Sequence, residues 1–593
     1  MNRLRSLTFH RYNLYNHVDT RQGRKAFVSA IGAFTFVLHS HLPYARLAGR
    51  WPHGEEWIHE AATETYIPLL QTLYDLKNEG VAYKLTLGIT PILAEQLADA
   101  DVLEHLGQYL DERIEASRKD MAYYEEEETE DKHLHYLAEW YLHLFERIKH
   151  DFDVRFNRDI IGSFRQLQDE GYIEITTSAA THGYLPLLSR DSSIQGQLKT
   201  GVQSYRRMFG RDPSGIWLPE CAYRPAYIDE TGATRPGLEY WLGQDGLKVF
   251  FSETHTITGG QPVGVAAGDV VGPYGDIKRR YLIPASNTVP ERSATTYKPY
   301  YVSDTTSGPN ARQHSDVTVI GRNNRTGQQV WSAEWGYPGD FDYREFHKKA
   351  GTSGLQYWRV TGAKTDLAYK DYYHPDWAAY KVEQHAEHFA HLVGDLIRTH
   401  HTQTGEYGLI SSNYDTELFG HWWFEGVAWI GKVLRHLAAN EDVELTTAST
   451  FVAAHPPQEV LHIPESSWGA GGNHFVWDNA ETHWMWEPIH EAEARMETLA
   501  GRFAAATPDE EKVLKQAARE LLLLQSSDWP FLVTTGQARE YAIQRFSQHM
   551  ERFNAMAGSL EKGRPDVARA DEFWELDKVF PDIDYHWFAK PGV

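Results

Sequence analysis

The run Gly32-Ala-Phe-Thr-Phe-Val-Leu-His39 is a compact β-prone stretch that ends in polar residues. Helical patterns follow it, because apolar residues recur three and four positions apart over 61–76 and 160–170. This alternation of strand and helix is typical of a parallel barrel or an open α/β sheet, with functional groups at the carboxyl ends of the strands. Four further runs repeat the form of the first: Leu85–Thr90, Ile173–Thr177, Gly215–Leu218 and Gly408–Ser411.

The composition indicates a protein that acts on a neutral partner. The 593 residues include 58 basic and 82 acidic side chains, for a net charge of -24, which opposes binding to nucleic acid or to an anionic membrane. Cys221 is the single cysteine, so no intramolecular disulfide can form and a reducing cytoplasm is the expected location. We expect Cys221 to be a small buried residue and not a nucleophile. The longest aliphatic run, Leu521–Leu524, is far shorter than the roughly 20 residues of a membrane span.

The pattern changes along the chain and predicts several parts. Residues 1–30 contain basic residues but no apolar signal segment, so we expect a flexible extension. Charged, aromatic helical sequence predicts a helical insertion at about 100–157. Sequence rich in Gly, Ser, Thr and Pro predicts long covering loops, or a lid, at about 254–324. The expected parts are thus the extension, a catalytic barrel (31–455) and a helical C-terminal domain (456–593).

Two acidic residues lie just past hydrophobic runs in aromatic-rich sequence. Glu220 lies in Trp217-Leu-Pro-Glu-Cys-Ala-Tyr223, and Asp415 in Tyr414-Asp-Thr-Glu-Leu-Phe-Gly-His-Trp-Trp423. Breaking a glycosidic bond requires one carboxyl to protonate the leaving oxygen and another to attack or to activate water, and the flat faces of Trp and Tyr suit a pyranose ring. We therefore interpret the pair as the centre of a sugar-cleaving site. From the residues alone, one of Asp415 and Glu417 is catalytic and the other supporting, or one of the two is the N-cap acid of the helix near Glu425.

Three histidines follow predicted strands: His39, His41 and His182. Alternation along an extended chain points the first two to one side. With Asp415 they fit a metal site that activates water, and equally they fit donors of hydrogen bonds to sugar hydroxyls or to a catalytic carboxylate. The many Trp and Tyr residues near the two carboxylates favour sugar binding, and both interpretations stay open.

Five motifs occur in one order along nearly all of the chain after about residue 31: His39-Ser-His-Leu-Pro43, Thr181-His-Gly183, Trp217–Tyr223, Tyr414–Trp423 and the region Trp468–Trp486. These motifs resemble glycoside hydrolase family 57, and within it the 1,4-α-glucan branching enzymes. The resemblance implies an incomplete (β/α)7 TIM-like barrel with a helical insertion and an α-helical C-terminal domain. It also implies a retaining double displacement without metal or cofactor. In that reaction a chain cut from an α-1,4-glucan donor is transferred to a 6-hydroxyl of an acceptor glucan, and an α-1,6 branch forms.

The resemblance assigns roles to individual residues. Glu220 matches the family's nucleophile and Asp415 its general acid/base. Tyr274 falls where branching enzymes carry a loop tyrosine that shields the covalent intermediate from water, within a loop region longer than is usual for the family. The predicted substrate-binding residues are His39, His41, His182 and His421 at the donor subsite, Trp331, Trp468 and Trp477 as aromatic glucan contacts, and also Trp217, Tyr274, Trp422 and Asp528.

Other functions fit part of this pattern. The same site also fits an α-amylase or a 4-α-glucanotransferase. Water and an acceptor sugar compete for the covalent intermediate, and the sequence does not determine which of them takes it. A non-catalytic glucan-binding protein keeps the aromatic groove, and a metal-dependent hydrolase uses the histidines. For the retaining mechanism, the two carboxyl groups must lie roughly 5 to 5.5 Å apart.

Overall fold

The computed structural model describes residues 30–262, 288–307, 313–331 and 336–592. Tyr274 and nearly all of the predicted extension lie outside these residues. The first sheet comprises β1 (Gly32–Ser40), β2 (Leu85–Ile89), β3 (Ile173–Thr176), β10 (Gly408–Asp415) and β11 (Val443–Leu445). The second comprises β4 (Gly215–Ile216), β7 (Val249–Ser252), β8 (Tyr300–Ser303), β9 (His314–Gly321) and β12 (Val460–Leu461), while β5 (Tyr227–Ile228) and β6 (Thr234–Arg235) pair separately.

Parallel pairing joins the two sheets into one series of strands. The neighbours β10, β1, β2 and β3 are parallel in the first sheet, as are β4, β7 and β9 in the second. A parallel bridge between Thr177 and Ile216 connects β3 to β4. The Asn323 N–H, just after β9, donates to the Ser411 carbonyl of β10 at 2.9 Å. The carboxyl ends of these strands therefore meet at one edge, where function is expected.

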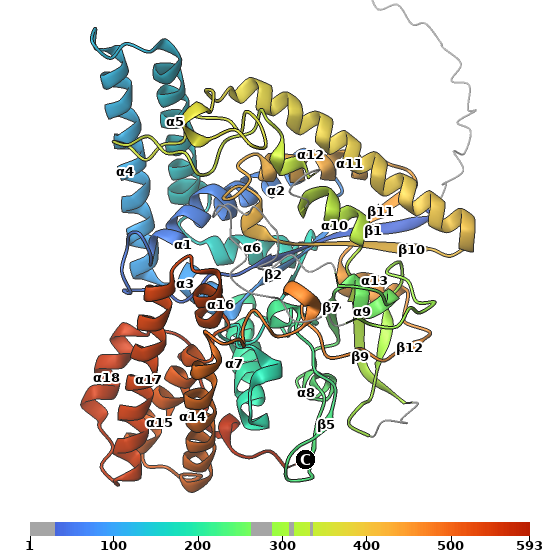
Figure 1. The fold of residues 1–593 in the computed structure, drawn as a ribbon, viewed down its shortest axis with the longest axis vertical. Helices are drawn as coiled ribbons and strands as arrows, with labels where there is room; N and C mark the ends of the chain where they lie inside the picture. Colours follow the sequence, from blue (N-terminus) through green and yellow to red (C-terminus); the bar gives the residue numbers. More distant parts are fainter. Residues whose placement is uncertain (1–29, 263–287, 308–312, 332–335, 593) are drawn as a thin grey trace, which may run out of the picture.

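Helices alternate with the strands, so the predicted α/β class is confirmed. In Figure 1, α11 and α12 lie above β1 and β10, and the pair α4 and α5 projects at the upper left. The helices between and beside the strands are α1 (Glu56–Ala61), α2 (Ile67–Asn78), α3 (Pro91–Leu97), α4 (Ala100–Glu125), α5 (Lys132–His150), α6 (Ile160–Asp169), α7 (Asp191–Phe209), α8 (Leu238–Gln244), α9 (Thr254–Thr258), α10 (Asn324–Trp331), α11 (Pro375–Thr404), α12 (Gly426–Ala438) and α13 (Ala448–Ala454). Among the described residues, no helix combines the length and the apolarity that a membrane crossing demands.

Two stretches show how local sequence sets these elements. The side chains of Asp99 and Asp131 accept from backbone N–H groups at the starts of α4 and α5, so both helices begin at an N-cap in the stretch predicted to be helical. The stretch 254–324 was predicted to be covering loops, but it contains α9, β8 and β9 as well. The strand signal there is a brief β-branched run at 317–320, within sequence rich in Gly, Ser and Thr.

The C-terminal helices form a bundle at the lower left of Figure 1. Their core includes Leu521–Leu524, which are fully buried. A capping box between Thr507 and Glu510 fixes the start of α15. The helices are α14 (His483–Arg502), α15 (Pro508–Leu524), α16 (Asp528–Thr535), α17 (Arg539–Glu561) and α18 (Val567–Leu576).

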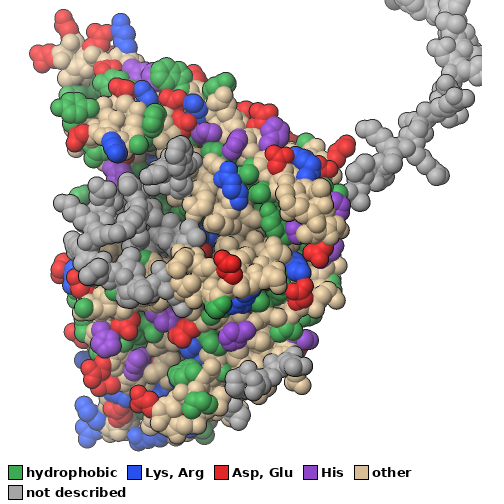
Figure 2. Space-filling view, turned by 45° about the vertical axis from the view of Figure 1, so that its right-hand side comes forward, with side chains coloured by type: hydrophobic (Ala, Val, Ile, Leu, Met, Phe, Trp, Pro, Cys, Tyr) green, Lys and Arg blue, Asp and Glu red, His purple; other side chains and the backbone are tan. Residues whose placement is uncertain are grey.

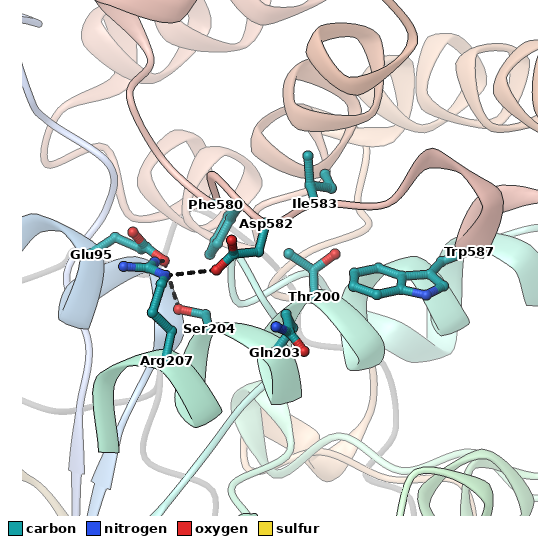
Figure 3. A pocket seen from close by; sticks show the side chains of 9 residues that line it. All are labelled: Glu95, Thr200, Gln203, Ser204, Arg207, Phe580, Asp582, Ile583 and Trp587. Carbon is teal, nitrogen blue, oxygen red and sulfur yellow. Dashed lines mark hydrogen bonds and ion pairs between the residues drawn. The ribbon is translucent and has the colours of Figure 1, made fainter. Parts of the chain in front are cut away.

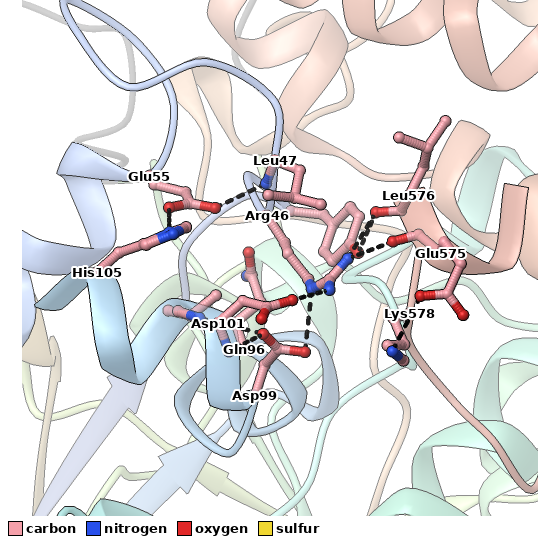
Figure 4. Close-up of polar contacts among 12 residues, drawn as sticks. Arg46, Leu47, Glu55, Gln96, Asp99, Asp101, His105, Glu575, Leu576 and Lys578 are labelled. Carbon is pink, nitrogen blue, oxygen red and sulfur yellow. Dashed lines mark hydrogen bonds and ion pairs between the residues drawn. The ribbon is translucent and has the colours of Figure 1, made fainter. Parts of the chain in front are cut away.

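Ion pairs and hydrogen bonds of two arginines connect this helical bundle to the part of the chain that contains the strands. The buried Arg46, in the loop after β1, binds the Asp99 carboxylate at 3.0 Å and also pairs with Asp101. Its Nη1 donates to the carbonyl oxygens of Glu575 and Leu576 at 2.7 and 3.2 Å, as Figure 4 shows. These contacts join the loop after β1 to the end of α18.

The second arginine lies on α7. Arg207 pairs with Glu95 of α3, and its Nε lies 3.0 Å from the Asp582 carboxylate, which follows α18 (Figure 3). Ser204, one turn earlier on α7, donates to Glu95 at 2.7 Å. The two anchors hold the helical bundle beside the carboxyl ends of the strands, which is where the candidate site lies.

Replacing Arg46 tests the first anchor. Arg46→Ala leaves Asp99 without its charge partner and removes a donor from each of two carbonyl groups, so we expect the free energy of unfolding to fall by about 3 to 5 kcal/mol. The control Arg118→Ala removes an exposed pair with Glu146 and is expected to cost about 1 kcal/mol or less. Urea denaturation followed by tryptophan fluorescence measures both, and equal losses would contradict this account.

Candidate active site

Glu220 occupies an unusual backbone conformation directly after β4. It lies in a short 3-10 turn, Pro219–Cys221, with φ +60° at Glu220 and +48° at Cys221. Left-handed φ values are uncommon outside glycine and cost about 1 to 3 kcal/mol, so the surrounding contacts must hold the turn in place. One such contact is the Trp468 N–H, which donates to the Glu220 carbonyl at 3.0 Å.

The Glu220 carboxyl group is held by two side chains from distant parts of the chain. Trp468 Nε1 donates to Glu220 Oε2 at 2.7 Å, and Ser527 Oγ donates to Oε1 at 3.2 Å. Burial raises the pKa of Glu220 to about 7, although the bond from Trp468 and the charge of His41 lower it. This carboxyl group therefore changes its charge near neutral pH.

Asp415 ends β10 and lies beside His39, its partner residue in the parallel register. Burial raises the pKa of Asp415 well above its ordinary value, and the charges of Glu417 and Glu220 add to the effect. Glu417 itself is buried, accepts from the Tyr66 hydroxyl and from the His41 N–H, and has a pKa raised by burial to about 7. Burial and the two neighbouring carboxyl groups therefore favour the protonated form of Asp415.

The three predicted histidines form one stacked group. The rings of His41 and His182 lie 3.9 Å apart, and the His39 ring lies 5.1 Å from His182. Burial lowers the pKa of His39 and of His182 well below the ordinary value. Burial also acts to lower the pKa of His41, but the carboxylates of Asp528, Glu220 and Glu417 outweigh it and raise that pKa. Two rings are therefore neutral and the third more readily carries a charge.

A directed hydrogen-bond chain runs from these rings to Glu220. Ser527 Oγ gives its hydrogen to Glu220, so it accepts from His182 Nδ1 at 2.9 Å. The remaining nitrogen of the neutral His182 ring, Nε2, then accepts from His39 Nε2 at 3.1 Å. The chain fixes the tautomer of both neutral histidines and aims the Ser527 hydroxyl at the carboxylate.

His41 connects the site to the C-terminal helices. Its Nε2 lies 3.0 Å from Asp528 Oδ1 at the start of α16, and its Nδ1 lies 3.1 Å from Thr90 Oγ1. Ser526 Oγ donates to the other Asp528 oxygen at 2.5 Å. Asp528, one of the predicted substrate-binding residues, thus lies beside the histidines, and the segment 526–528 forms one wall of the site.

Two of the predicted tryptophans join the same group. Trp217 stacks on His39 with centroids 4.7 Å apart and meets the Trp468 ring edge-on at 5.2 Å. Trp477, in contrast, is fully buried and stacks on Tyr184 at 4.5 Å, so it supports the loop and offers no open ring face to a sugar.

The remaining predicted residues lie further along the strand edge. His421 Nδ1 lies 2.8 Å from Glu64 Oε2, and the Trp422 N–H donates to the Glu417 carbonyl at 3.1 Å. Trp331 ends α10, with its ring 6.4 Å from that of Tyr414. Tyr274 lies outside the described residues.

Several residues of the site were not predicted. Ser526 and Ser527 precede α16 in a Ser-Ser-Asp sequence, which reads as an ordinary helix cap. Tyr66, Thr90 and Glu64 lie in or beside helices with no local signal of function. The expectation that Cys221 is buried is confirmed, and burial raises the pKa of its thiol well above the ordinary value.

The described residues contain one group of His, Asp and Glu side chains whose atoms are close enough to hold a metal ion together. It is formed by Glu520, His549 and Asp577 inside the C-terminal bundle, and not by the histidines of the site. Arg552 pairs with Asp577 there, which already neutralises that carboxylate.

Comparisons with known proteins agree with this arrangement. A family model described as "Glycosyl hydrolase family 57" matches residues 35–464, and a second, described as "1,4-alpha-glucan branching enzyme, C-terminal", matches residues 488–588. A 1,4-alpha-glucan branching enzyme of Thermococcus kodakarensis is 43% identical over 561 residues, covering 93% of this chain and 78% of that protein.

Solved structures give the same result. The crystal structure of that family 57 branching enzyme, in complex with glucose, covers 95% of this chain and 97% of its own, with a TM-score of 0.83 and 41% identity. A family 57-type branching enzyme of Pyrococcus horikoshii has a TM-score of 0.81 and 39% identity, and the match covers 95% of this chain and 98% of that one. The α-amylase AmyC of Thermotoga maritima has a TM-score of 0.77 and 30% identity, and the match covers 95% of this chain and 100% of that one. The chain therefore belongs to glycosyl hydrolase family 57.

Proposed function

We propose that this protein is a 1,4-α-glucan branching enzyme that uses Glu220 as nucleophile and Asp415 as general acid/base. The observation that carries the residue assignment is the difference between the two buried carboxyl groups. Glu220 accepts hydrogen bonds from Trp468 and Ser527, which stabilise its anion, whereas the pKa of Asp415 is raised well above its ordinary value. The identity to branching enzymes over nearly the whole chain supports the reaction.

The first step cleaves an α-1,4 link of the donor glucan. The Glu220 carboxylate attacks the anomeric carbon, the bond to the leaving oxygen breaks, and Asp415 transfers its proton to that oxygen. Burial and the negative charges of Glu417 and Glu220 favour the protonated form of Asp415, as an acid requires. The product is a glycosyl ester on Glu220.

The second step forms the branch. Asp415, now a carboxylate, takes the proton of a 6-hydroxyl on the acceptor glucan, whose oxygen attacks the anomeric carbon and displaces Glu220. The two displacements leave the α-configuration unchanged. The hydrogen bonds from Trp468 and Ser527 stabilise Glu220 as it leaves, so one pair of donors serves both steps.

The histidines serve as hydrogen-bonding and positioning groups in this proposal. Both ring nitrogens of His41 and of His182 have partners, and the His39 and His182 rings are held neutral. Ring nitrogens that already have partners, and a link through Ser527 to the Glu220 carboxyl group, suit a hydrogen-bonding role better than a shared metal ion. His421, Trp331 and Trp422 are assigned to more distant parts of the donor glucan, and Tyr274 to a covering loop.

We further propose that the seven strands β10, β1, β2, β3, β4, β7 and β9 form a (β/α)7 barrel. The parallel bridge at Thr177 and the hydrogen bond between Asn323 and Ser411 support closure of the series. The family 57 match ends at residue 464, and the match to the branching-enzyme C-terminal model begins at 488. This break supports a division between barrel and helical domain, which we place near 456. The pair α4 and α5 corresponds to the helical insertion.

The partner is a neutral polysaccharide that acts as both donor and acceptor. The net charge of -24 opposes nucleic acid, and Figure 2 shows acidic, basic and hydrophobic side chains interspersed over the face drawn. The single cysteine supports a cytoplasmic location. The second candidate function is α-amylase activity, because the similar AmyC structure bears that name.

Incubation with amylose tests the reaction and the nucleophile. We expect falling iodine colour with few new reducing ends, and new short chains after enzymatic debranching. Glu220→Gln should lower the rate by about 10⁴-fold or more, because the amide cannot form the ester intermediate. Cys221→Ala is the neighbouring control and should keep most of the activity. Abundant reducing ends without α-1,6 links would instead identify an amylase.

The pH dependence tests the hydrogen bond to Glu220. Because Glu220 must be ionised and Asp415 protonated, kcat/KM should follow a bell-shaped profile whose acidic limb lies near pH 7. Trp468→Phe removes the donor that lowers the pKa of Glu220, so this pKa rises and the acidic limb moves to higher pH. In the control Trp217→Phe the indole N–H has no hydrogen-bond partner among the described residues, and the limb should stay in place. A limb unmoved in Trp468→Phe would refute the assignment.

A further inference from the structure

Aromatic side chains are exposed at the starts of α5 and α11, on the upper part of the molecule in Figure 1. Tyr136 lies early in α5, Trp377 lies in the first turn of α11, and Phe341 lies in the segment that precedes α11. These residues are 42%, 50% and 52% exposed. Such clustered exposure of large rings indicates a binding surface. We call Tyr136, Phe341, Trp377 and Arg359 the outer aromatic surface.

Ring contacts hold this surface in one arrangement. The Trp377 ring stacks on the His374 ring, with centroids 3.9 Å apart, and His374 lies 4.4 Å from His133. His133 lies 5.9 Å from Tyr136 and stacks on Tyr372 at 5.6 Å. Side chains that are already packed lose little conformational entropy when a ligand binds.

Polar groups border the rings. The Arg359 guanidinium lies 5.9 Å from the Trp377 ring centroid and donates to the Phe341 carbonyl at 3.1 Å. It also binds the carboxylates of Asp371 and Asp342, at 2.7 and 3.4 Å. One positive charge is therefore matched by two negative ones, which disfavours phosphates and other anions. Flat apolar faces beside oriented donors and acceptors fit a neutral, hydroxyl-rich ring.

The segment 336–374 carries Phe341 and Arg359 of this surface and also contacts a predicted substrate-binding residue. On its other side the Phe346 ring meets the His421 ring edge-on at 5.5 Å, and His421 binds Glu64 at 2.8 Å. Within the described part of the chain, no contact joins the outer aromatic surface to the two catalytic carboxyl groups. The outer aromatic surface is therefore distinct from the catalytic carboxyl groups, although its segment also contacts His421.

We propose that the outer aromatic surface is a second, non-catalytic binding site for an α-1,4-glucan chain. This proposal rests on the proposed function, because it takes its ligand from the polymer on which the site acts. Pyranose faces stack on Trp377 and Tyr136 while the Arg359 and Asp371 groups bond sugar hydroxyls. A polymer held at this surface stays at high local concentration near the catalytic site, which favours long chains over short ones.

Native gel electrophoresis through glycogen tests the proposal in the full-length Glu220→Gln protein, which leaves the polymer intact. We expect the added pair Trp377→Ala and Tyr136→Ala to weaken retardation by glycogen about fivefold. Trp377→Phe, which keeps an aromatic face, should retain most of the retardation. The control is Tyr227→Ala, since Tyr227 is likewise 42% exposed but lies on β5. It should migrate like the parent.

Activity separates the two proposals. In the otherwise native enzyme, the double variant should branch long amylose more slowly while its rate on short maltooligosaccharides is unchanged. If native protein branches amylose but the double variant is retarded as strongly as its parent, the surface proposal alone is overturned. A changed oligomeric state with unchanged retardation would assign the surface to contacts between copies and also overturn it. Absence of branching by the native protein would instead refute the proposed function.

Discussion

The carboxyl group of Glu220 accepts hydrogen bonds from Trp468 and Ser527, residues that follow it by 248 and 307 positions. Both bonds form only if the end of β4, the loop after β12 and the turn between α15 and α16 meet at one place. The anchors at Arg46 and Arg207 satisfy this requirement, because they hold the helical bundle against the loop after β1 and against α7. The C-terminal helices are therefore part of the site and do not merely flank it.

Burial raises the pKa of both catalytic carboxyl groups, and their neighbours act differently on the two. Glu220 receives two donors and faces His41, whose pKa is raised, so its anion is partly compensated. Asp415 faces the carboxyl groups of Glu417 and Glu220, so its neutral form is favoured. The environment of Glu220 suits a nucleophile and that of Asp415 suits an acid, and a retaining mechanism needs one carboxyl group in each role.

The sequence carried enough local signal to predict the strands that place the two acids. The apolar runs at 32–39 and 408–411 became β1 and β10, whose parallel register sets His39 beside Asp415. The histidines were placed at strand ends by the same patterns, while the stacking of their rings is seen only in the structure. These predictions succeeded because burial on both faces of a parallel strand leaves a strong apolar pattern.

Other features depend on contacts between distant segments and leave no local pattern. Ser527 looks like a helix cap until the bundle docks and aims its hydroxyl at Glu220, and β9 has only a short β-branched run. Trp477 matched the predicted aromatic contacts by residue type, yet its ring is packed on Tyr184. Residue type alone does not distinguish a ring that supports a loop from one that faces a ligand.

The most direct test of the central claim is the identity of the residue that forms the covalent intermediate. A fluorinated α-maltosyl fluoride slows both displacements, so the glycosyl ester accumulates and survives proteolysis for mass spectrometry. The account predicts one labelled peptide, with the sugar on Glu220 of the turn Pro219–Cys221. A label on Asp415 or on any other residue would contradict it.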